Sequence, residues 1–134
     1  MHVLMRLIPL ILIAPLLTGC VVAIGNDDFG EGSKNWSRVE RENRAAIDGL
    51  RLGMGIYEVQ DAMPNEPEFN EAFSVAGVSH RVLFYRTQRV DGDGVTTRDE
   101  TTPLVFTDGR LTGWGESAWR NLTGRPLAER APRD

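Results

Sequence analysis

Cysteine is almost absent from this chain of 134 residues, in which Cys20 is the only one. A disulfide within one copy of the chain is therefore excluded. A long apolar segment is also lacking. The longest apolar run, residues 7–17, has eleven residues, whereas a helix that spans a bilayer needs roughly 17 to 25. The sequence therefore predicts no retained transmembrane anchor.

An excess of positive charge is lacking too. The chain has 15 basic and 19 acidic residues, which gives a formal net charge of −4. Domains that bind nucleic acid usually carry a clustered basic face, so we expect no nucleic-acid partner. Arg6 is the only basic residue before Cys20, so removal of residues 1–19 makes the chain more acidic still.

The first 19 residues have the layout of an export signal. Arg6 precedes the apolar run, and the small residues Thr18 and Gly19 follow it. A segment of this kind is removed from the mature protein. Residues 17–20, with the sequence Leu-Thr-Gly-Cys, resemble the lipobox of bacterial lipoproteins.

The lipobox resemblance implies cleavage between Gly19 and Cys20 and lipid on the Cys20 thiol. The thiol would carry a diacylglyceryl group and the new amino terminus a third acyl chain. Two or more chains give stable membrane anchoring. Val21 follows Cys20, whereas an aspartate at this position would resemble an inner-membrane retention signal. Val21 therefore favours the outer membrane, with the domain facing the periplasm. The alternative is an ordinary secretory signal with an incidental cysteine.

Composition divides the rest of the chain into three segments. Residues 20–36 are rich in glycine and acidic residues and have no helical or strand period, which is typical of a flexible tether. Residues 37–122 are long enough for one folded domain. Residues 123–134 contain two prolines and few large apolar side chains, so we expect a disordered tail.

Two helices are expected at the start of the domain. Apolar residues recur at three- and four-residue spacings over residues 37–50. Ser37 and Glu40 have the spacing of a capping box at the start of this helix. The second helix is expected over residues 56–63, because Pro64 follows and proline interrupts a helix.

Three strands are expected after the helices, over residues 81–90, 101–106 and 111–115, which are rich in strand-forming residues. Asp108 and Gly109 favour the positive φ angles of a two-residue hairpin between the last two strands. We therefore expect an α+β fold with two N-terminal helices packed on one face of a three-stranded antiparallel sheet. After the third strand we expect residues 117–122 to close the domain as a short helical turn.

Six residues of the predicted helical region form a pattern: Asn43, Ile47, Leu50, Gly53, Met54 and Val59. This pattern resembles the domain shared by BamE and the SmpA/OmlA lipoproteins. Residues 69–73, 82–88 and 102–115 more closely resemble a family of small proteobacterial lipoproteins of unknown function, and the likeness covers about residues 40–119. It implies a BamE-like fold and a setting in outer-membrane assembly, because BamE is an accessory of the machine that inserts β-barrels. Gly55 departs from the pattern, which usually has a serine or threonine cap there.

His80 is the one residue that suggests catalysis. It is the only histidine after Cys20 and is a candidate general base, with Ser79 or Asp99 as a partner. Catalysis requires a nucleophile, a base and an orienting group within mutual reach, and no spacing in this sequence provides them. We therefore expect that the protein is not an enzyme.

Asp91 and Asp93 are candidate calcium ligands in a glycine-rich turn. An EF-hand loop, however, requires a glutamate at its twelfth position, where this chain has Thr102. A plain turn is the better interpretation. We expect no metal site and no cofactor.

Four residues form the predicted partner or ligand surface: Trp114, Trp119, Arg86 and Arg89. Trp114 lies between two glycines, either as an exposed indole for a ligand or, in the interpretation we favour, as part of the core. Trp119 lies near the end of the domain, where partner contact is more plausible. Arg86 and Arg89 are typical of a solvated sheet face, and a basic patch of this kind can also orient a domain at an anionic membrane surface.

These observations favour a lipid-anchored periplasmic protein that acts through protein–protein contacts in outer-membrane assembly or maintenance. Its expected partners are the membrane, through lipid on Cys20, and other envelope proteins. The alternative is a periplasmic binding or inhibitor module for a small ligand, a lipid or an enzyme. An enzyme that uses His80 is the weakest hypothesis.

Overall fold

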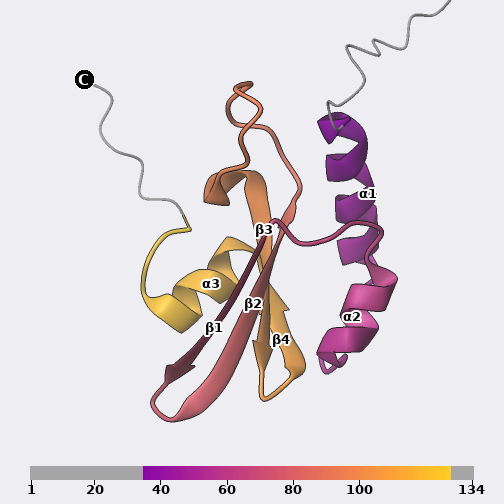
Figure 1. Ribbon diagram of the computed structural model, residues 1–134. Helices are drawn as coiled ribbons and strands as arrows, with labels where there is room; N and C mark the ends of the chain where they lie inside the picture. Colours follow the sequence, from indigo (N-terminus) through magenta and orange to yellow (C-terminus); the bar gives the residue numbers. More distant parts are fainter. Residues whose placement is uncertain (1–34, 128–134) are drawn as a thin grey trace, which may run out of the picture. The chain divides into compact units, whose positions relative to one another are not determined.

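The computed structural model describes residues 35–127, which form helices on both sides of a four-stranded sheet (Figure 1). The expected signal, Gly19, Cys20 and most of the expected tether lie outside the described residues. In chain order the elements are α1 (Trp36–Asp48), α2 (Ile56–Ala62), β1 (Phe69–Val75), β2 (Val78–Arg86), the short 3-10 helix η1 (Arg98–Glu100), β3 (Thr101–Thr107), β4 (Arg110–Trp114) and α3 (Gly115–Thr123).

The sheet is an antiparallel meander with the strand order β1-β2-β3-β4. Ala76 and Gly77 join β1 to β2 with φ angles of 50° and 80°, and Asp108 and Gly109 join β3 to β4 with φ angles of 49° and 77°. Two successive positive φ angles give a turn whose twist matches that of the flanking strands. The hairpin expected at Asp108 and Gly109 is confirmed.

The first core lies between the sheet and the pair α1 and α2. Alternate residues of a strand point to opposite faces of a sheet, so Leu83 and Tyr85 of β2 point to this side. Burial, with a smaller contribution from the charge of Glu66, raises the pKa of Tyr85 to about 12. The buried residues of this core are Ile47, Leu50, Val59, Met63, Leu83, Tyr85, Leu104, Phe106 and Leu111.

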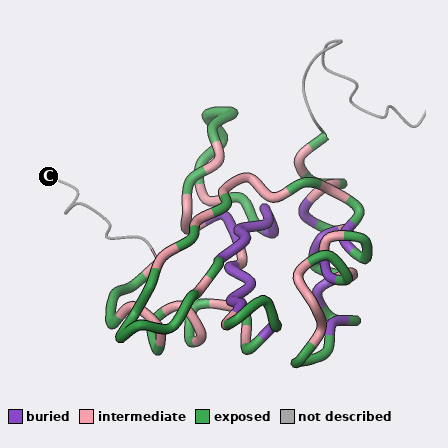
Figure 2. Tube along the Cα trace, turned by 60° about the horizontal axis from the view of Figure 1, so that its bottom comes forward, coloured by how far each residue is buried: buried purple, intermediate pink, exposed green. Residues whose placement is uncertain are grey.

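The second core lies between the other face of the sheet and α3. The ring of Trp119 stands edge-on to that of Phe84, with 5.5 Å between the ring centroids. Figure 2 shows that the buried residues follow the central strands and the α1–α2 pair, whereas the hairpin turns are exposed. The second core contains buried Val82, Phe84 and Val105, against which Phe69, Phe73, Ala118, Trp119, Leu122 and Leu127 pack.

The expected fold class is wrong in two respects. The sheet has a fourth strand, β1, which the sequence did not signal because the turn after it is Ala-Gly and alanine seldom adopts a positive φ angle. The short helical turn expected over residues 117–122 is a full helix, α3, on the face opposite α1 and α2. The result is a three-layer helix–sheet–helix arrangement (Figure 1), not a two-layer one.

Helix α1 begins one residue earlier than expected and has a different cap. The side chain of Asn35 accepts a hydrogen bond from the Arg38 backbone N–H at 3.1 Å, which satisfies one of the free donors in the first turn. Ser37 is therefore inside the helix. Glu40 does not complete a capping box, because its carboxylate is bound to Arg86.

The described chain includes residues 123–127, the first part of the segment for which the sequence predicted a disordered tail. Gly124 ends α3 with a φ angle of 69°, a conformation that glycine adopts without strain. Leu127 packs against the second core, and its backbone N–H donates to the Glu116 carboxylate at 3.2 Å. Residues 128–134 lie outside the described residues.

Candidate functional site

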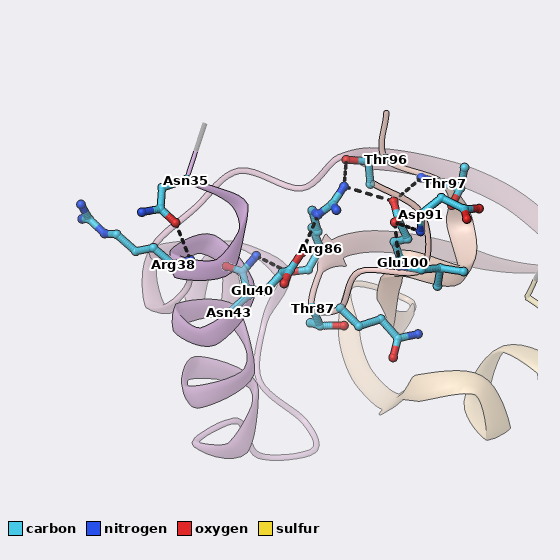
Figure 3. Close-up of polar contacts among 12 residues, drawn as sticks. Asn35, Arg38, Glu40, Asn43, Arg86, Thr87, Asp91, Thr96, Thr97 and Glu100 are labelled. Carbon is cyan, nitrogen blue, oxygen red and sulfur yellow. Dashed lines mark hydrogen bonds and ion pairs between the residues drawn. The ribbon is translucent and has the colours of Figure 1, made fainter. Parts of the chain in front are cut away.

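A buried ion cluster lies at the carboxyl end of β2. The guanidinium of Arg86 donates through Nε to Glu40 of α1 at 2.9 Å and through Nη1 to Glu100 of η1 at 3.1 Å. A second hydrogen bond from Nη1 reaches the Thr96 hydroxyl at 2.8 Å. Figure 3 shows these side chains converging from the helix, the strand and the loop that follows the strand. We call Arg86, Glu40 and Glu100 the ion cluster.

Glu100 organises the loop between β2 and β3. Its carboxylate accepts backbone N–H groups of Val90, Asp91 and Thr97 at 2.8, 3.1 and 3.1 Å (Figure 3). Burial by itself raises the pKa of Glu100, but these hydrogen bonds and the charge of Arg86 outweigh burial, so the pKa lies below its ordinary value of 4.5. The charged form is the form that the fold stabilises.

Replacement of Glu100 by glutamine should reduce the pH dependence of stability. A carboxyl whose pKa is lowered on folding stabilises the protein above its unfolded pKa, and this contribution is lost as the pH falls through the folded pKa. We expect Glu100→Gln to lower the free energy of unfolding by about 2 kcal/mol at pH 7. The difference in the free energy of unfolding between the variant and the unmodified protein should shrink steadily below pH 4.5. Denaturant titrations at pH 7, 5, 4 and 3 measure this difference. A difference that stays constant over this range would contradict the role assigned to Glu100.

The start of α1 is attached to the same end of the sheet. The guanidinium of Arg86 lies 4.3 Å from the ring centroid of Trp36, within the range of a cation–π contact. Asn43 donates to the Arg86 carbonyl at 2.8 Å, and Arg44 donates to the Thr87 carbonyl. We call this end, which contains the ion cluster and the start of α1, the near end.

Four exposed apolar side chains lie at the opposite end of the domain: Leu52, Tyr57, Val75 and Val78. We call this end the far end. Leu52 and Tyr57 are 65% and 78% exposed. Figure 1 shows the β1–β2 turn, the β3–β4 turn and α2 together at the bottom of the view, with the start of α1 at the top.

Backbone hydrogen bonds hold the far end together. Ile56 N–H donates to the Gly109 carbonyl at 3.1 Å, and Asp108 N–H donates to the Ser79 carbonyl at 3.0 Å. Gly53 N–H donates to the Leu111 carbonyl at 2.8 Å. The segment before α2 and the two hairpin turns therefore form one continuous surface, not three independent loops.

A comparison with protein families gives one match. The family model described as "Protein of unknown function (DUF3192)" matches residues 18–121, which is most of the chain. The chain belongs to this family. Neither the curated proteins nor the solved structures gave a match.

The DUF3192 match includes Cys20 and continues through the described helices and strands to Asn121 in α3. The residues of the near end and of the far end therefore both lie within the part of the chain that the family model matches. The family description names no function, so the geometry of the site has to suggest one.

The four residues of the predicted surface are scattered over this family member. Arg86 is 2% exposed and belongs to the ion cluster, so it is not a surface residue. Arg89 is exposed in the loop after β2. Trp119 is partly buried in the second core. Trp114, for which we favoured a place in the core, is 36% exposed.

Sequence reasoning missed the far end. Leu52 precedes α2 and Tyr57 is the second residue of α2, positions that also suit a core side chain, and only the structure shows that both are exposed.

The candidate catalytic and calcium residues take ordinary structural roles. The ring of His80 forms a hydrogen bond with the Thr107 hydroxyl, with 3.0 Å between Nδ1 and Oγ1. Asp93 accepts the Val95 N–H at 2.9 Å, as in a plain turn. Among residues 35–127 no group of three acidic, histidine or cysteine side chains is arranged to hold a metal ion. In the same range no helix is long and apolar enough to cross a membrane.

Trp114 and Tyr85 do not share a cavity. Tyr85 is enclosed in the first core, whereas Trp114 lines a shallow surface pocket of about 390 Å³. Ala118 and Leu122 of α3 line the same pocket. The side of the sheet that faces α1 and α2 is filled around Tyr85 by core side chains, and the space near Trp114 lies beside α3.

Proposed function

We propose that this protein is a lipid-anchored periplasmic protein that acts through protein–protein contacts in outer-membrane assembly or maintenance. Residues 17–20 resemble a lipobox, and the family match includes Cys20. The likeness of the helical pattern to BamE and the SmpA/OmlA lipoproteins supports the envelope setting. Lipid on Cys20 would supply the anchor.

The position of the far end is the observation that carries this proposal. The chain enters the domain at Asn35, at the near end, and four apolar side chains are exposed at the opposite end. A partner bound to Leu52 and Tyr57 would therefore contact the end of the domain opposite to the start of the described chain. Tyrosine is enriched among the residues that contribute most to binding at protein interfaces, which favours a protein partner.

Site-specific photo-crosslinking in intact cells tests this function. We expect a photoreactive residue at Tyr57 of the full chain to form an adduct with one or a few envelope proteins. Val95 is the matched control, because it is a 60% exposed apolar residue in the loop at the near end. We expect no such adduct there. Equal labelling at both positions, or no protein adduct at Tyr57, would contradict a partner at the far end.

A binding module remains the second candidate, and the pocket beside Trp114 is the observation that favours it. Ala118 and Leu122 line it together with Thr112 and Asn121, so it offers both apolar and polar contacts, as a fatty acid would need. Addition of a soluble fatty acid should then shift the fluorescence of the unmodified protein and leave that of Trp114→Phe unchanged. Identical responses of the two proteins would exclude this pocket as a lipid site.

A further inference from the structure

The two edge strands of the sheet, β4 and β1, differ in whether the backbone groups on their outer side are paired. The outer edge of β4 is covered, because Gly53 N–H donates to the Leu111 carbonyl and Leu111 N–H donates to the Met54 carbonyl, both at 2.8 Å. Gly55 also forms an isolated bridge with Arg110. Strand β1, in contrast, has β2 as its one strand neighbour within residues 35–127. Its outer edge therefore presents unpaired backbone groups.

Strand β1 lacks the features that usually protect an edge. Exposed edge strands are generally short, or carry lysine, proline or a bulge that prevents pairing with another chain. β1 has seven residues, pairs with β2 in unbroken register and contains no proline, lysine or arginine. Its one charged side chain, Glu71, forms an ion pair with Arg98. Asn70, Ala72 and Ser74 are small or neutral, and exposed.

We infer that β1 pairs antiparallel with β1 of a second copy of this chain, with Ala72 on the two-fold axis. This register uses all seven residues, because it sets Phe69 opposite Val75 and Asn70 opposite Ser74 in the other copy. Glu71 then stands opposite Phe73, so no two like charges are directly opposed, a condition that matters for strand pairs. The inference is independent of the proposed function.

The charges around the axis favour a second copy. In each copy Glu71 is paired with Arg98 of the same chain. The two Glu71 side chains near the axis would therefore belong to two neutral ion pairs and would not repel each other strongly. The guanidinium of Arg98 also lies over the rings of Phe69 and Phe84, at 4.7 and 4.2 Å from their centroids, which keeps it beside the edge. One strand buries less than the roughly 800 Å² per partner of a standard interface, so the dimer should be weak and concentration-dependent.

Cysteine crosslinking of the full chain in cells tests this register. In antiparallel strands, directly opposed Cα atoms are about 4.5 to 5.5 Å apart, within the roughly 4.4 to 6.8 Å that a disulfide spans. We expect Ala72→Cys to give a disulfide-linked dimer when a copper–phenanthroline oxidant accepts the two electrons. Ser74→Cys is the matched control, because it lies on the same strand face and is exposed. The two Ser74 positions would be four residues apart along the strands, roughly 13 Å, so we expect at least a tenfold lower yield of dimer.

Two further chains complete the test. The unmodified chain shows whether Cys20 contributes to any dimer. Asn70→Lys with Ser74→Lys, added to Ala72→Cys, places lysines opposite each other across the axis and should abolish the crosslink. Both substitutions lie on the exposed face of β1, so they leave unchanged the face that packs on the second core. No dimer from Ala72→Cys, equal yields from Ala72→Cys and Ser74→Cys, persistence of the crosslink in the lysine variant, or an adduct of Ala72→Cys with a different protein would each overturn the pairing.

Discussion

Replacement of Arg86 by alanine should lower the free energy of unfolding by about 3 to 5 kcal/mol, the usual cost of removing one partner from a buried ion pair. Arg86 is almost fully enclosed, and its two carboxylate partners are nearly so. Without the guanidinium, Glu40 and Glu100 would lose the positive charge that both contact, and Glu100 would keep only its hydrogen bonds to backbone N–H groups. Small domains have about 5 to 15 kcal/mol of stability in total, so this change should bring the domain close to unfolding.

Arg38→Ala is the control for Arg86→Ala. It also removes an arginine that is bound to a glutamate, Glu42, but that pair is exposed at the surface of α1. Exposed pairs contribute little to stability, so we expect almost no change. Chemical denaturation followed by far-ultraviolet circular dichroism compares the two variants. Similar losses in both would mean that the ion cluster does not stabilise the domain as the contacts indicate.

Replacement of Cys20 by serine should remove essentially all of the protein from the outer-membrane fraction. Three acyl chains bind a bilayer strongly, since each buried methylene contributes about 0.8 kcal/mol, and serine has no thiol to receive the diacylglyceryl group. The folded domain should be unaffected, because Cys20 precedes Asn35, the first described residue. Density-gradient fractionation of cell envelopes gives the measurement.

Thr18→Ser is the matched control for Cys20→Ser, because it keeps a small hydroxyl residue before the cleavage point. We expect it to fractionate with the outer membrane as the unmodified protein does. An unchanged distribution of Cys20→Ser protein would show that something other than lipid on this residue holds the chain there.

Local patterns predicted much of the fold. The helical spacing before Leu50, the proline after Met63 and the aspartate–glycine pair at the β3–β4 turn are signals within a few residues, and the corresponding elements are present. β1 and α3 were not predicted correctly because their evidence is tertiary. β1 is partly exposed on both faces, and the turn that follows it begins at Ala76. α3 can be recognised as a layer only when both faces of β2 and β3 are known to be buried.

The candidate site was harder to predict for the same reason. Arg86 looks like a residue of a solvated strand, and its partner Glu40 is 46 residues away in the chain. Glu40 itself looked like part of a helix cap. Only the packing of the start of α1 against the end of β2 brings the two together. The far end depends on contacts over a similar separation, between the segment before α2 and the β3–β4 turn.

The near and far ends acquire a functional meaning only if the chain is anchored through Cys20. Intact-mass spectrometry of the protein extracted from outer membranes tests this most directly. We predict a chain that begins at Cys20 and carries a diacylglyceryl group and one further acyl chain. A mass that retains residues 1–19, or that corresponds to a cleaved chain without lipid, would contradict the lipid anchor on which the proposed function rests.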